Sequence, residues 1–512
     1  MPATKPAASP TTDSIPPFEH SYAALPEHFY APIDPAPVRK PLLLRLNQAL
    51  VEELGLDADW LAGPDGVAML AGNRLPATAR PIAMAYAGHQ FGQFVPSLGD
   101  GRAILLGEVI DRAGRRRDVQ LKGAGRTPFS RSGDGRAVLG PVLREYILGE
   151  AMQGLGIPTT RALAIVATGE PVFRERPEPG AILTRVAASH IRVGTFEYFA
   201  RRGDIEAVRT LADHLIRRHY QTLREPDLAG GEPYAHLLAA IATRQGELIA
   251  RWLLVGFIHG VMNTDNMALS GETIDYGPCA FMDEYDPNQV YSSIDHFGRY
   301  AYGQQPSIGL WNLTQLANCL LPLLDEDIEE AKTKAHSALD AYGKAFAPAY
   351  YGGLRAKIGL IDQPGSDQSA DDDLVQDLLG RMAAHRADFT NTFRLLSDVT
   401  LEDPTDLEPV RHGFTDPTAF DAWAKQWRNR LAQQHETDTE RQTRMRALNP
   451  AFIPRNHRVQ EVIDAATERG DLEPLEQLLA VVSRPYDEHP SLAAYRNPPE
   501  PHEVVQQTFC GT

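Results

Sequence analysis

The sequence has few cysteines and no long apolar run. Its only cysteines are Cys279, Cys319 and Cys510, which argues against a secreted disulfide framework and against a structural zinc site. No apolar stretch approaches the ~20 residues of a membrane-spanning helix. The first residues, MPATKPAASPTTDSIPP, lack arginine and the apolar core of a signal peptide. These absences predict a cytoplasmic protein.

Positive charge is also scarce. The 50 Lys and Arg residues are outnumbered by 67 Asp and Glu residues, which gives a formal net charge of -17. This balance opposes general binding to nucleic acid or to an anionic membrane, so we expect neither partner. Residues 1–20 are rich in Pro, Ala, Ser and Thr and are predicted to form a disordered tail.

The rest of the chain divides into a strand-rich and a helix-rich part. Glycine turns separate apolar runs typical of strands at 103–109, 119–121, 161–167 and 181–186, with one helix predicted from about Pro141 to Gly156. From Asp204, a predicted helix cap, the pattern is helical, with further helices at about 234–255, 326–346 and 460–482. We predict an α+β, protein-kinase-like two-lobed fold with a strand-rich N-lobe (21–200) and a helical C-lobe (201–512).

The segment HGVMNTDN, residues 259–266, is the most informative stretch. The kinase catalytic loop reads H-x-D-x-x-x-x-N. His259 and Asn266 have that spacing, but Val261 stands where the catalytic Asp belongs. Asp275-Tyr276-Gly277 follows, as the metal-binding D-F-G element would. Oxygens of Asn266 and Asp275 suit Mg²⁺ or Mn²⁺, and the adjacent Asp265 is the candidate base.

Two glycine-rich segments precede this loop. GDGRA occurs at 99–103 and again at 133–137, with LKGAGRTPFSRS between them. Glycines let backbone N–H groups approach a phosphate, and interspersed cations neutralise its charge. We therefore predict a loop that wraps a polyphosphate.

Lys122 ends a predicted strand, where a kinase places its phosphate-binding lysine. Its expected partner is a glutamate of the following helix. Glu145 and Glu150 both lie there and face different directions; we prefer Glu145, which is nearer the apolar stripe. Arg185 and Arg192 follow on and after the last predicted strand and are candidates to hold further phosphates.

A series of longer motifs points to one family. The motifs, in order, are GHQFG from Gly88, LGDGRA from Leu98, LKGAGRTP from Leu121, SGDGRAVL from Ser132, REYILGEAM from Arg144, IPTTRAL from Ile157, HGVMNTDNM from His259, IDYGPCAFMD from Ile274 and NPAFIPRN from Asn449. With these motifs, which span nearly its whole length, the chain resembles the selenoprotein O (SelO, YdiU) family of kinase-fold protein adenylyltransferases.

The resemblance implies that ATP binds flipped relative to ordinary kinases, so that AMP passes to a Ser, Thr or Tyr hydroxyl of a protein and pyrophosphate is released. It implies Asp265 as the proton acceptor, with Asn266 and Asp275 holding metal. Together with Lys122 and its preferred partner Glu145, Asp265 forms the predicted catalytic group. It also implies nucleotide binding by Gly99, Gly101, Arg102, Lys122, Asp134, Gly135, Arg185, Arg192 and Asp275. A regulatory disulfide between Cys279 and Cys510 is implied as well.

The residues by themselves leave three alternatives open. One is a phosphotransferase that uses Asp265 as its base. Another is transfer of UMP from UTP with Mn²⁺. The third is a non-catalytic pseudokinase that serves as a scaffold, although a binding module has no need of both the metal pair and Lys122.

Overall fold

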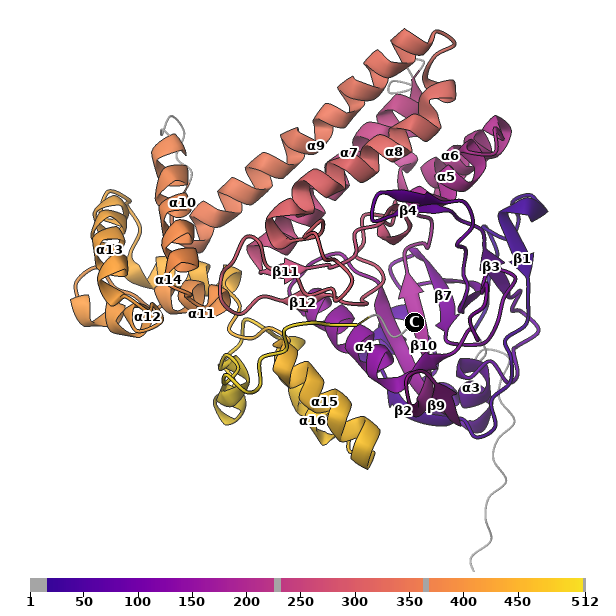
Figure 1. Cartoon of the computed structure of the whole chain (residues 1–512), viewed down its shortest axis with the longest axis horizontal. Helices are drawn as coiled ribbons and strands as arrows, with labels where there is room; N and C mark the ends of the chain where they lie inside the picture. The colour runs from indigo at the N-terminus through magenta and orange to yellow at the C-terminus, as the bar shows by residue number, and fades with distance from the viewer. Residues whose placement is uncertain (1–15, 225–231, 362–367, 510–512) are drawn as a thin grey trace, which may run out of the picture.

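The fold is described from a computed structural model, which covers residues 16–224, 232–361 and 368–509. An antiparallel sheet forms the N-terminal part and the rest is largely helical (Figure 1), which confirms the mixed α+β prediction. Most of the expected tail, residues 1–20, lies outside the described residues. Glu19, near its end, is held against the sheet by a backbone hydrogen bond from its N–H to the Glu108 carbonyl, at 2.8 Å.

Seven strands form the main path of the sheet, and every neighbouring pair is antiparallel. In spatial order they are β1 (Tyr30–Pro32), β3 (Ile82–Met84), β6 (Ala103–Ile110), β7 (Arg116–Lys122), β10 (Pro177–Ala187), β9 (Arg161–Phe173) and β2 (Leu42–Leu46), and β8 (Ala137–Val138) pairs with β10. The four strands predicted from sequence are β6, β7, β9 and β10. Lys122 lies between Ala103 and Leu183 in the register, so it projects from the middle of the sheet.

Alternate residues of the central strands enter two different cores. On one face, Leu105 and Leu183 pack with helix α4 (Leu139–Gly154). On the other, Ile104 and Ile182 pack with the short helices α1 (Gln48–Leu54), α2 (Ala58–Ala62) and α3 (Pro64–Leu70). Helix α4 ends just before Gly156, whose φ of 73° suits glycine, as the sequence predicted.

The helical part begins directly after the sheet. Its first helices are α5 (Val193–Ala200), α6 (Ile205–His219), α7 (Pro233–Leu254), α8 (Gln305–Leu324) and α9 (Ile328–Lys357). Asp204 caps α6 by accepting from Ala207 N at 3.0 Å, which confirms that prediction. Helices α7, α8 and α9 lie side by side and project from the molecule (Figure 1). Helix α9 runs well past the predicted end at 346.

A second group of helices surrounds a separate core that contains Trp423 and Trp427. These helices are α10 (Gln368–Ala384), α11 (Phe389–Leu396), α12 (Glu408–Arg411), α13 (Pro417–Leu431) and α14 (Asp438–Leu448). Two more, α15 (Asn456–Arg469) and α16 (Glu473–Val482), pack against α4. The prediction of one helix over 460–482 is therefore wrong. Gly470, with a φ of 65°, ends α15, and a new helix starts after it.

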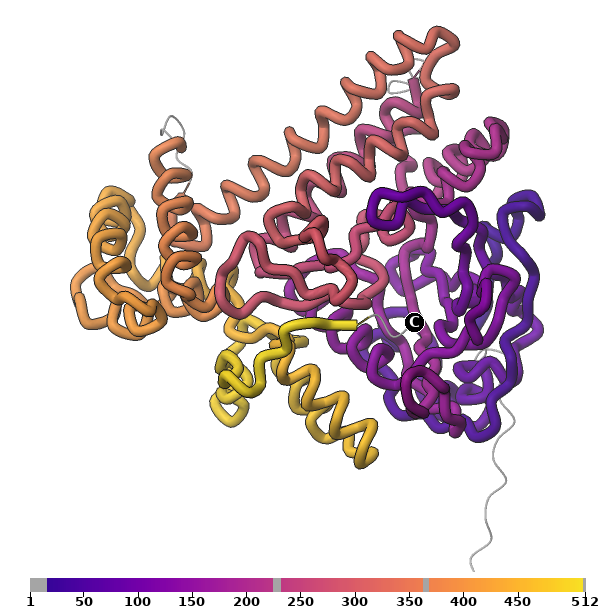
Figure 2. Tube along the Cα trace, viewed as in Figure 1, coloured from indigo at the N-terminus to yellow at the C-terminus, as the bar shows by residue number. Residues whose placement is uncertain are grey.

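Three connections bring distant segments together near the sheet. Strands β11 (Phe257–Ile258) and β12 (Ala280–Phe281) pair at the two ends of the segment that carries the HGVMNTDN and Asp-Tyr-Gly motifs. Strands β4 (Gly88–Gln90) and β5 (Gln93–Val95) form a hairpin beside it. Near the C-terminus the chain returns to this region, as the yellow end of the trace shows (Figure 2), and Thr508 N donates to Tyr291 O at 2.8 Å.

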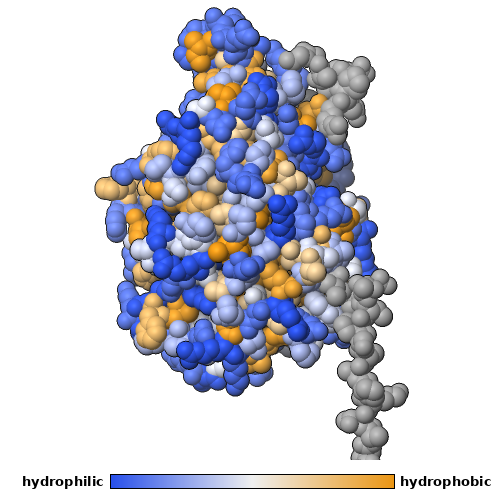
Figure 3. Space-filling view, turned by 90° about the vertical axis from the view of Figure 1, so that its right-hand side faces the viewer, coloured by the Kyte–Doolittle hydropathy of each residue, from blue (hydrophilic) through white to orange (hydrophobic). Residues whose placement is uncertain are grey.

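None of the helices in the described part of the chain is long and apolar enough to cross a membrane. On the face drawn in Figure 3, hydrophobic residues form small separate groups among hydrophilic ones.

Candidate functional site

A cavity of about 640 Å³ opens between the middle of the sheet and the segment that follows β11. It gathers every site residue predicted from the sequence. These residues are Gly99, Gly101, Arg102, Lys122, Asp134, Gly135, Glu145, Arg185, Arg192, Asp265, Asn266 and Asp275. Val261 lines the cavity as well. The sheet register and the turn after β11 thus bring together residues as distant in the sequence as Gly99 and Asp275, which are 176 positions apart.

Lys122 makes two ion pairs inside this cavity. Its Nζ lies 2.5 Å from Glu145 Oε2 and 3.4 Å from Asp275 Oδ1. Glu150 is occupied elsewhere, because its carboxylate receives two hydrogen bonds from Arg161, at 2.7 and 2.8 Å. Of the two glutamates on α4, the structure therefore places Glu145 against Lys122.

Two buried arginines extend this group. Arg185 Nη2 lies 2.7 Å from Glu145 Oε1 and 2.6 Å from Asp275 Oδ1, and Arg192 Nη1 lies 2.6 Å from Asp275 Oδ2. Burial raises the pKa of Asp275, but Arg185, Arg192 and Lys122 outweigh it and hold the pKa well below its usual range. We call these five residues the site cluster. Among the described residues that line the cavity, seven Lys and Arg residues outnumber five Asp and Glu residues, so the cavity has positive charge left for an anion.

The backbone at Asp275 is unusual. Its φ of 62° lies in the left-handed region, which residues other than glycine rarely adopt. Gly277 N donates to Asp275 O at 2.8 Å, and the His259 ring contacts Ile274 O at 2.9 Å through Nε2. Strained backbone of this kind persists where surrounding contacts determine it, and it occurs often at active sites. The result is a carboxylate aimed into the cavity.

Asp265 and Asn266 line the same cavity, and the Asp265 carbonyl accepts a hydrogen bond from Arg192. Burial raises the pKa of Asp265 to about 7, while Arg192 works against that rise. Asp265 Oδ1 is buried without a hydrogen-bond partner. Asn266 Nδ2 donates to Val261 O at 2.9 Å, which leaves its Oδ1 for another contact.

These groups fit a hard divalent cation. Asn266 and Asp275 present an amide and a carboxylate oxygen to the cavity, and Asp265, the neighbour of Asn266 in the chain, lines the same cavity. Oxygen ligands of this kind suit Mg²⁺ or Mn²⁺, which take their other ligands from phosphate and water.

The two glycine-rich segments both line the cavity, and each packs against the chain that lies between them in the sequence. Gly99 has a φ of 63°, and a Cβ there would overlap the Phe129 ring. Gly135 has a φ of 68°, and a Cβ there would lie 2.1 Å from Gly125 O. The carboxylate of Asp100 is buried and accepts from Met84 N at 3.1 Å and from Gln120 Nε2 at 3.2 Å, and burial raises its pKa.

Sequence reasoning assigned no role to several residues of the site. Arg174 binds Asp134 at 2.9 Å and lines the cavity. The Tyr86 ring lies 4.7 Å from the Arg192 guanidinium carbon. Gln90, in the hairpin β4–β5, approaches Asp265 Oδ2 at 3.5 Å. The GHQFG motif was the available signal for this hairpin, but its residue types alone indicate no chemistry.

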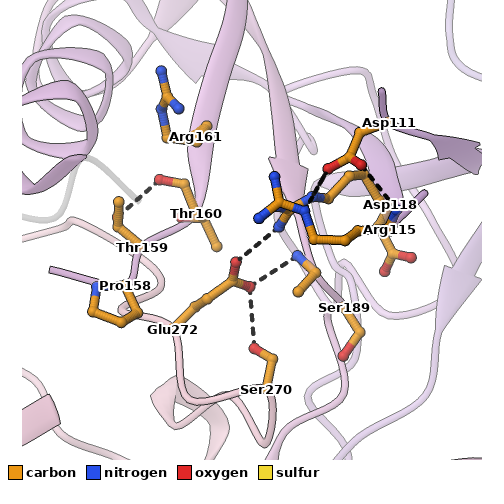
Figure 4. Close-up of polar contacts among 12 residues, drawn as sticks. Asp111, Arg115, Asp118, Pro158, Thr159, Thr160, Arg161, Ser189, Ser270 and Glu272 are labelled. Carbon is orange, nitrogen blue, oxygen red and sulfur yellow. Dashed lines mark hydrogen bonds and ion pairs between the residues drawn. The ribbon is translucent and has the colours of Figure 1, made fainter. Parts of the chain in front are cut away.

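A second buried polar group lies where the sheet meets the helical part (Figure 4). Glu272 accepts hydrogen bonds from Ala188 N at 2.8 Å and from Ser270 Oγ at 3.1 Å, and it lies 3.5 Å from Arg117 Nη1. Burial raises the pKa of Glu272 to about 7. None of these residues lines the main cavity.

Cys279 is buried four residues beyond Asp275. Its expected partner, Cys510, lies outside the described residues, so the disulfide stays a prediction. The chain does approach this point, because Thr508 Oγ1 donates to Pro278 O at 2.6 Å.

Comparison with known proteins identifies the family of this chain. The family model described as "Protein adenylyltransferase SelO" matches residues 16–483. The chain belongs to the SelO family. Proteins named "Protein nucleotidyltransferase YdiU" are similar over 97% of this chain and 99% of their own length: those from Bradyrhizobium sp. (strain ORS 278) and Rhodopseudomonas palustris (strain BisB5) are 61% and 59% identical. The SelO chain described here is therefore a protein nucleotidyltransferase, and the resemblance inferred from its motifs is confirmed.

Proposed function

We propose that the enzyme transfers AMP from ATP to Ser, Thr or Tyr hydroxyls of other proteins and releases pyrophosphate. One observation carries the proposal: Lys122, Arg185 and Arg192 converge on Asp275 inside the cavity, while Val261 stands where a kinase has its base. The cations suit the β- and γ-phosphates deep in the cavity, which leaves the α-phosphate nearer the acceptor.

The polypeptide has the layout of a protein-kinase-like two-lobed enzyme, with an N-lobe at 21–200 and a C-lobe at 201–512. Lys122 on β7 and Glu145 on α4 take the places of the lysine and glutamate that pair in active kinases. Glu145 also holds Arg185. The glycine loops bind the nucleotide through Gly99, Gly101, Arg102, Asp134 and Gly135. Such a site works by positioning and by neutralising charge.

Asp265 is the proposed proton acceptor. The acceptor hydroxyl oxygen attacks the α-phosphorus, and the bond between the α-phosphorus and the bridging oxygen of the leaving pyrophosphate breaks. The hydroxyl proton passes to the Asp265 carboxylate. Lys122, Arg185 and Arg192 stabilise the negative charge that gathers on the leaving pyrophosphate. A carboxylate whose pKa lies near neutrality is well matched to this proton transfer.

Asn266 and Asp275 would hold the Mg²⁺ or Mn²⁺ ion, which when bound neutralises phosphate charge. We place the enzyme in the cytoplasm. The proposed Cys279–Cys510 disulfide would tie the C-terminal tail to the segment after Asp275 and limit entry of a protein substrate.

The experiment is transfer of label to protein from ATP labelled at either the α- or the γ-phosphate. Label from the α position alone, with a mass gain of one AMP, is expected. Transfer of the γ label alone would overturn the proposal in favour of a phosphotransferase. A parallel reaction with α-labelled UTP and Mn²⁺ tests the UMP alternative, and stronger labelling from UTP than from ATP would replace AMP with UMP.

A further inference from the structure

We propose that His89 and Glu197 are positioning residues of the transferase, which act through the Thr264 hydroxyl to fix the turn that presents Asp265 and Asn266 to the cavity. The inference rests on the roles of Asp265 and Asn266 proposed above.

Two side chains, of Thr264 and Glu197, close a hydrogen-bonded ring with the backbone N–H and the imidazole of His89. Thr264 Oγ1 donates to Glu197 Oε2 at 2.5 Å and accepts from His89 N at 2.6 Å. The other carboxylate oxygen of Glu197, Oε1, contacts His89 Nδ1. The ring joins three separate elements, namely hairpin β4–β5, helix α5 and the turn η4 (Thr264–Asn266). We call it the His89 clamp.

The clamp holds a residue that cannot itself reach the substrate. Thr264 is fully buried and does not line the cavity, whereas Asp265 and Asn266, the next two residues, do. Thr264 therefore acts only through the turn to which it belongs. A reacting carboxylate needs its neighbours locked, because a displacement of about 1 Å can cost roughly 100-fold in rate.

Neighbouring contacts hold the same turn from both sides. Arg192, at the start of α5, donates through Nη1 to Asp265 O at 2.7 Å. Before the turn, Asn263 Oδ1 accepts from Phe91 N at 3.0 Å and from Tyr300 OH at 2.6 Å. Helix α5 thus supports the turn twice, through Arg192 on the backbone and through Glu197 on the Thr264 hydroxyl.

The alternative is that the clamp only fills space. Glu197 is 1% exposed, and a buried carboxylate is costly unless it is paired and hydrogen-bonded. A space-filling role would be served better by an apolar side chain. Both carboxylate oxygens are instead used on the clamp. The two roles make opposite predictions for substitutions of Thr264.

Thr264→Val keeps the shape of the side chain and removes the hydroxyl, whereas Thr264→Ser keeps the hydroxyl and removes a methyl group. If the clamp positions the turn, the Ser variant should retain a kcat for AMP transfer within about 3-fold of wild type, while the Val variant should lose about 10- to 100-fold. Both should bind ATP with a Kd within about 3-fold of wild type, measured by calorimetry, because Thr264 does not line the cavity. The reverse order, with Val active and Ser impaired, would overturn the proposal.

A matched control comes from the helical part. Thr390 is buried and its hydroxyl has no hydrogen-bond partner, so Thr390→Val should leave kcat unchanged. Glu197→Gln, which keeps the oxygen that accepts from Thr264, should restore most of the kcat lost in Glu197→Ala; equal loss in both variants would contradict the hydrogen-bonding role. If the wild-type enzyme transferred only the γ label, the proposed function would be refuted. The relative kcat of Thr264→Ser and Thr264→Val, measured for whichever group is transferred, would still test the clamp.

Discussion

Strand β7 contributes to two ionic groups on one face. One group lies in the cavity and is proposed to bind the substrate, whereas the other lies away from the cavity and joins elements of the fold. Lys122 at its end belongs to the site cluster. Asp118, four residues earlier, belongs to a second group, in which Arg218 Nη2 lies 2.5 Å and His190 Nδ1 3.0 Å from its carboxylate. Gln120 stands between them and contacts Arg185 at 3.4 Å. The two groups share the strand, the burial and the residue types.

The second group, which we call the shoulder cluster, lies outside the cavity and has no surplus of positive charge. It comprises Glu108, Arg116, Asp118, His190 and Arg218. Burial raises the pKa of Asp118, but the nearby Arg218 and His190 outweigh it and lower the pKa to about 2. Burial lowers the pKa of His190. The two arginines of the cluster then face its two carboxylates and a third, Glu19, which lies 2.6 Å from Arg116.

The site cluster, in contrast, opens on the cavity and has one cation more than it has carboxylates. An ionic group away from the cavity, with no surplus positive charge, stabilises a junction between elements. An open group with surplus charge is prepared for a ligand of opposite sign. The contrast predicts that substitutions in the site cluster stop transfer, whereas charge changes at the sheet–helix junction alter stability alone.

The largest effect is expected for Asp275→Ala. The change removes the carboxylate shared by three cations together with a proposed metal ligand, so transfer of α-label to protein should fall by at least about 1000-fold. Thermal unfolding of the same variant is the control, since the loss must occur in folded protein. A folded variant with more than a tenth of wild-type activity would contradict the proposed role.

Asp265→Asn should damage turnover and spare binding. The amide cannot accept the proton of the attacking hydroxyl, so kcat should fall by about 100- to 1000-fold, while the Kd for ATP measured by calorimetry stays within about 3-fold of wild type. Equal losses in binding and turnover would instead assign Asp265 to the nucleotide or to the metal.

Lys122→Ala should cost at least about 100-fold in kcat/KM, as expected when a positioned charge is lost at a transition state. Lys122→Arg is the matched variant that keeps the charge and changes its geometry. Because the lysine pairs with both Glu145 and Asp275, the arginine should recover only part of the loss. Full activity of Lys122→Ala would break the contrast between the two clusters.

Local sequence patterns were sufficient to predict the four strands β6, β7, β9 and β10, the α4 helix and the members of the site cluster. The spacing from His259 to Asp275 and the strand-end Lys122 are short-range signals with a known chemical use. The apolar stripe of α4 favoured Glu145 over Glu150, and the 2.5 Å contact between Lys122 and Glu145 agrees with that preference. The His89 clamp and the shoulder cluster could not be predicted, because each joins residues about 100 or more positions apart, such as Asp118 and Arg218, and no local pattern records such pairs.

The smallest effect is expected at Glu272, beside the shoulder cluster, and it concerns stability alone. Burial raises the pKa of this carboxyl from its ordinary value of 4.5 to about 7. The folded state therefore binds the proton more tightly than the unfolded state, and the contribution of Glu272 to stability falls as the pH rises from about 4.5 to 7. At pH 8 the full penalty is present, up to about 3 kcal/mol at 1.36 kcal/mol for each pKa unit.

Glu272→Gln removes this penalty and keeps an oxygen for Ala188 N and Ser270. The variant should unfold at a higher denaturant concentration than wild type at pH 8, and the difference should shrink at pH 5, where the wild-type carboxyl is protonated. The exposed Glu329→Gln, on α9, is the control and should show no pH-dependent difference. AMP transfer should be unchanged, because Glu272 does not line the main cavity. A variant destabilised equally at both pH values would show that the charge of Glu272 stabilises the junction, and the distinction between ionic groups in the cavity and those away from it would then need a different physical basis.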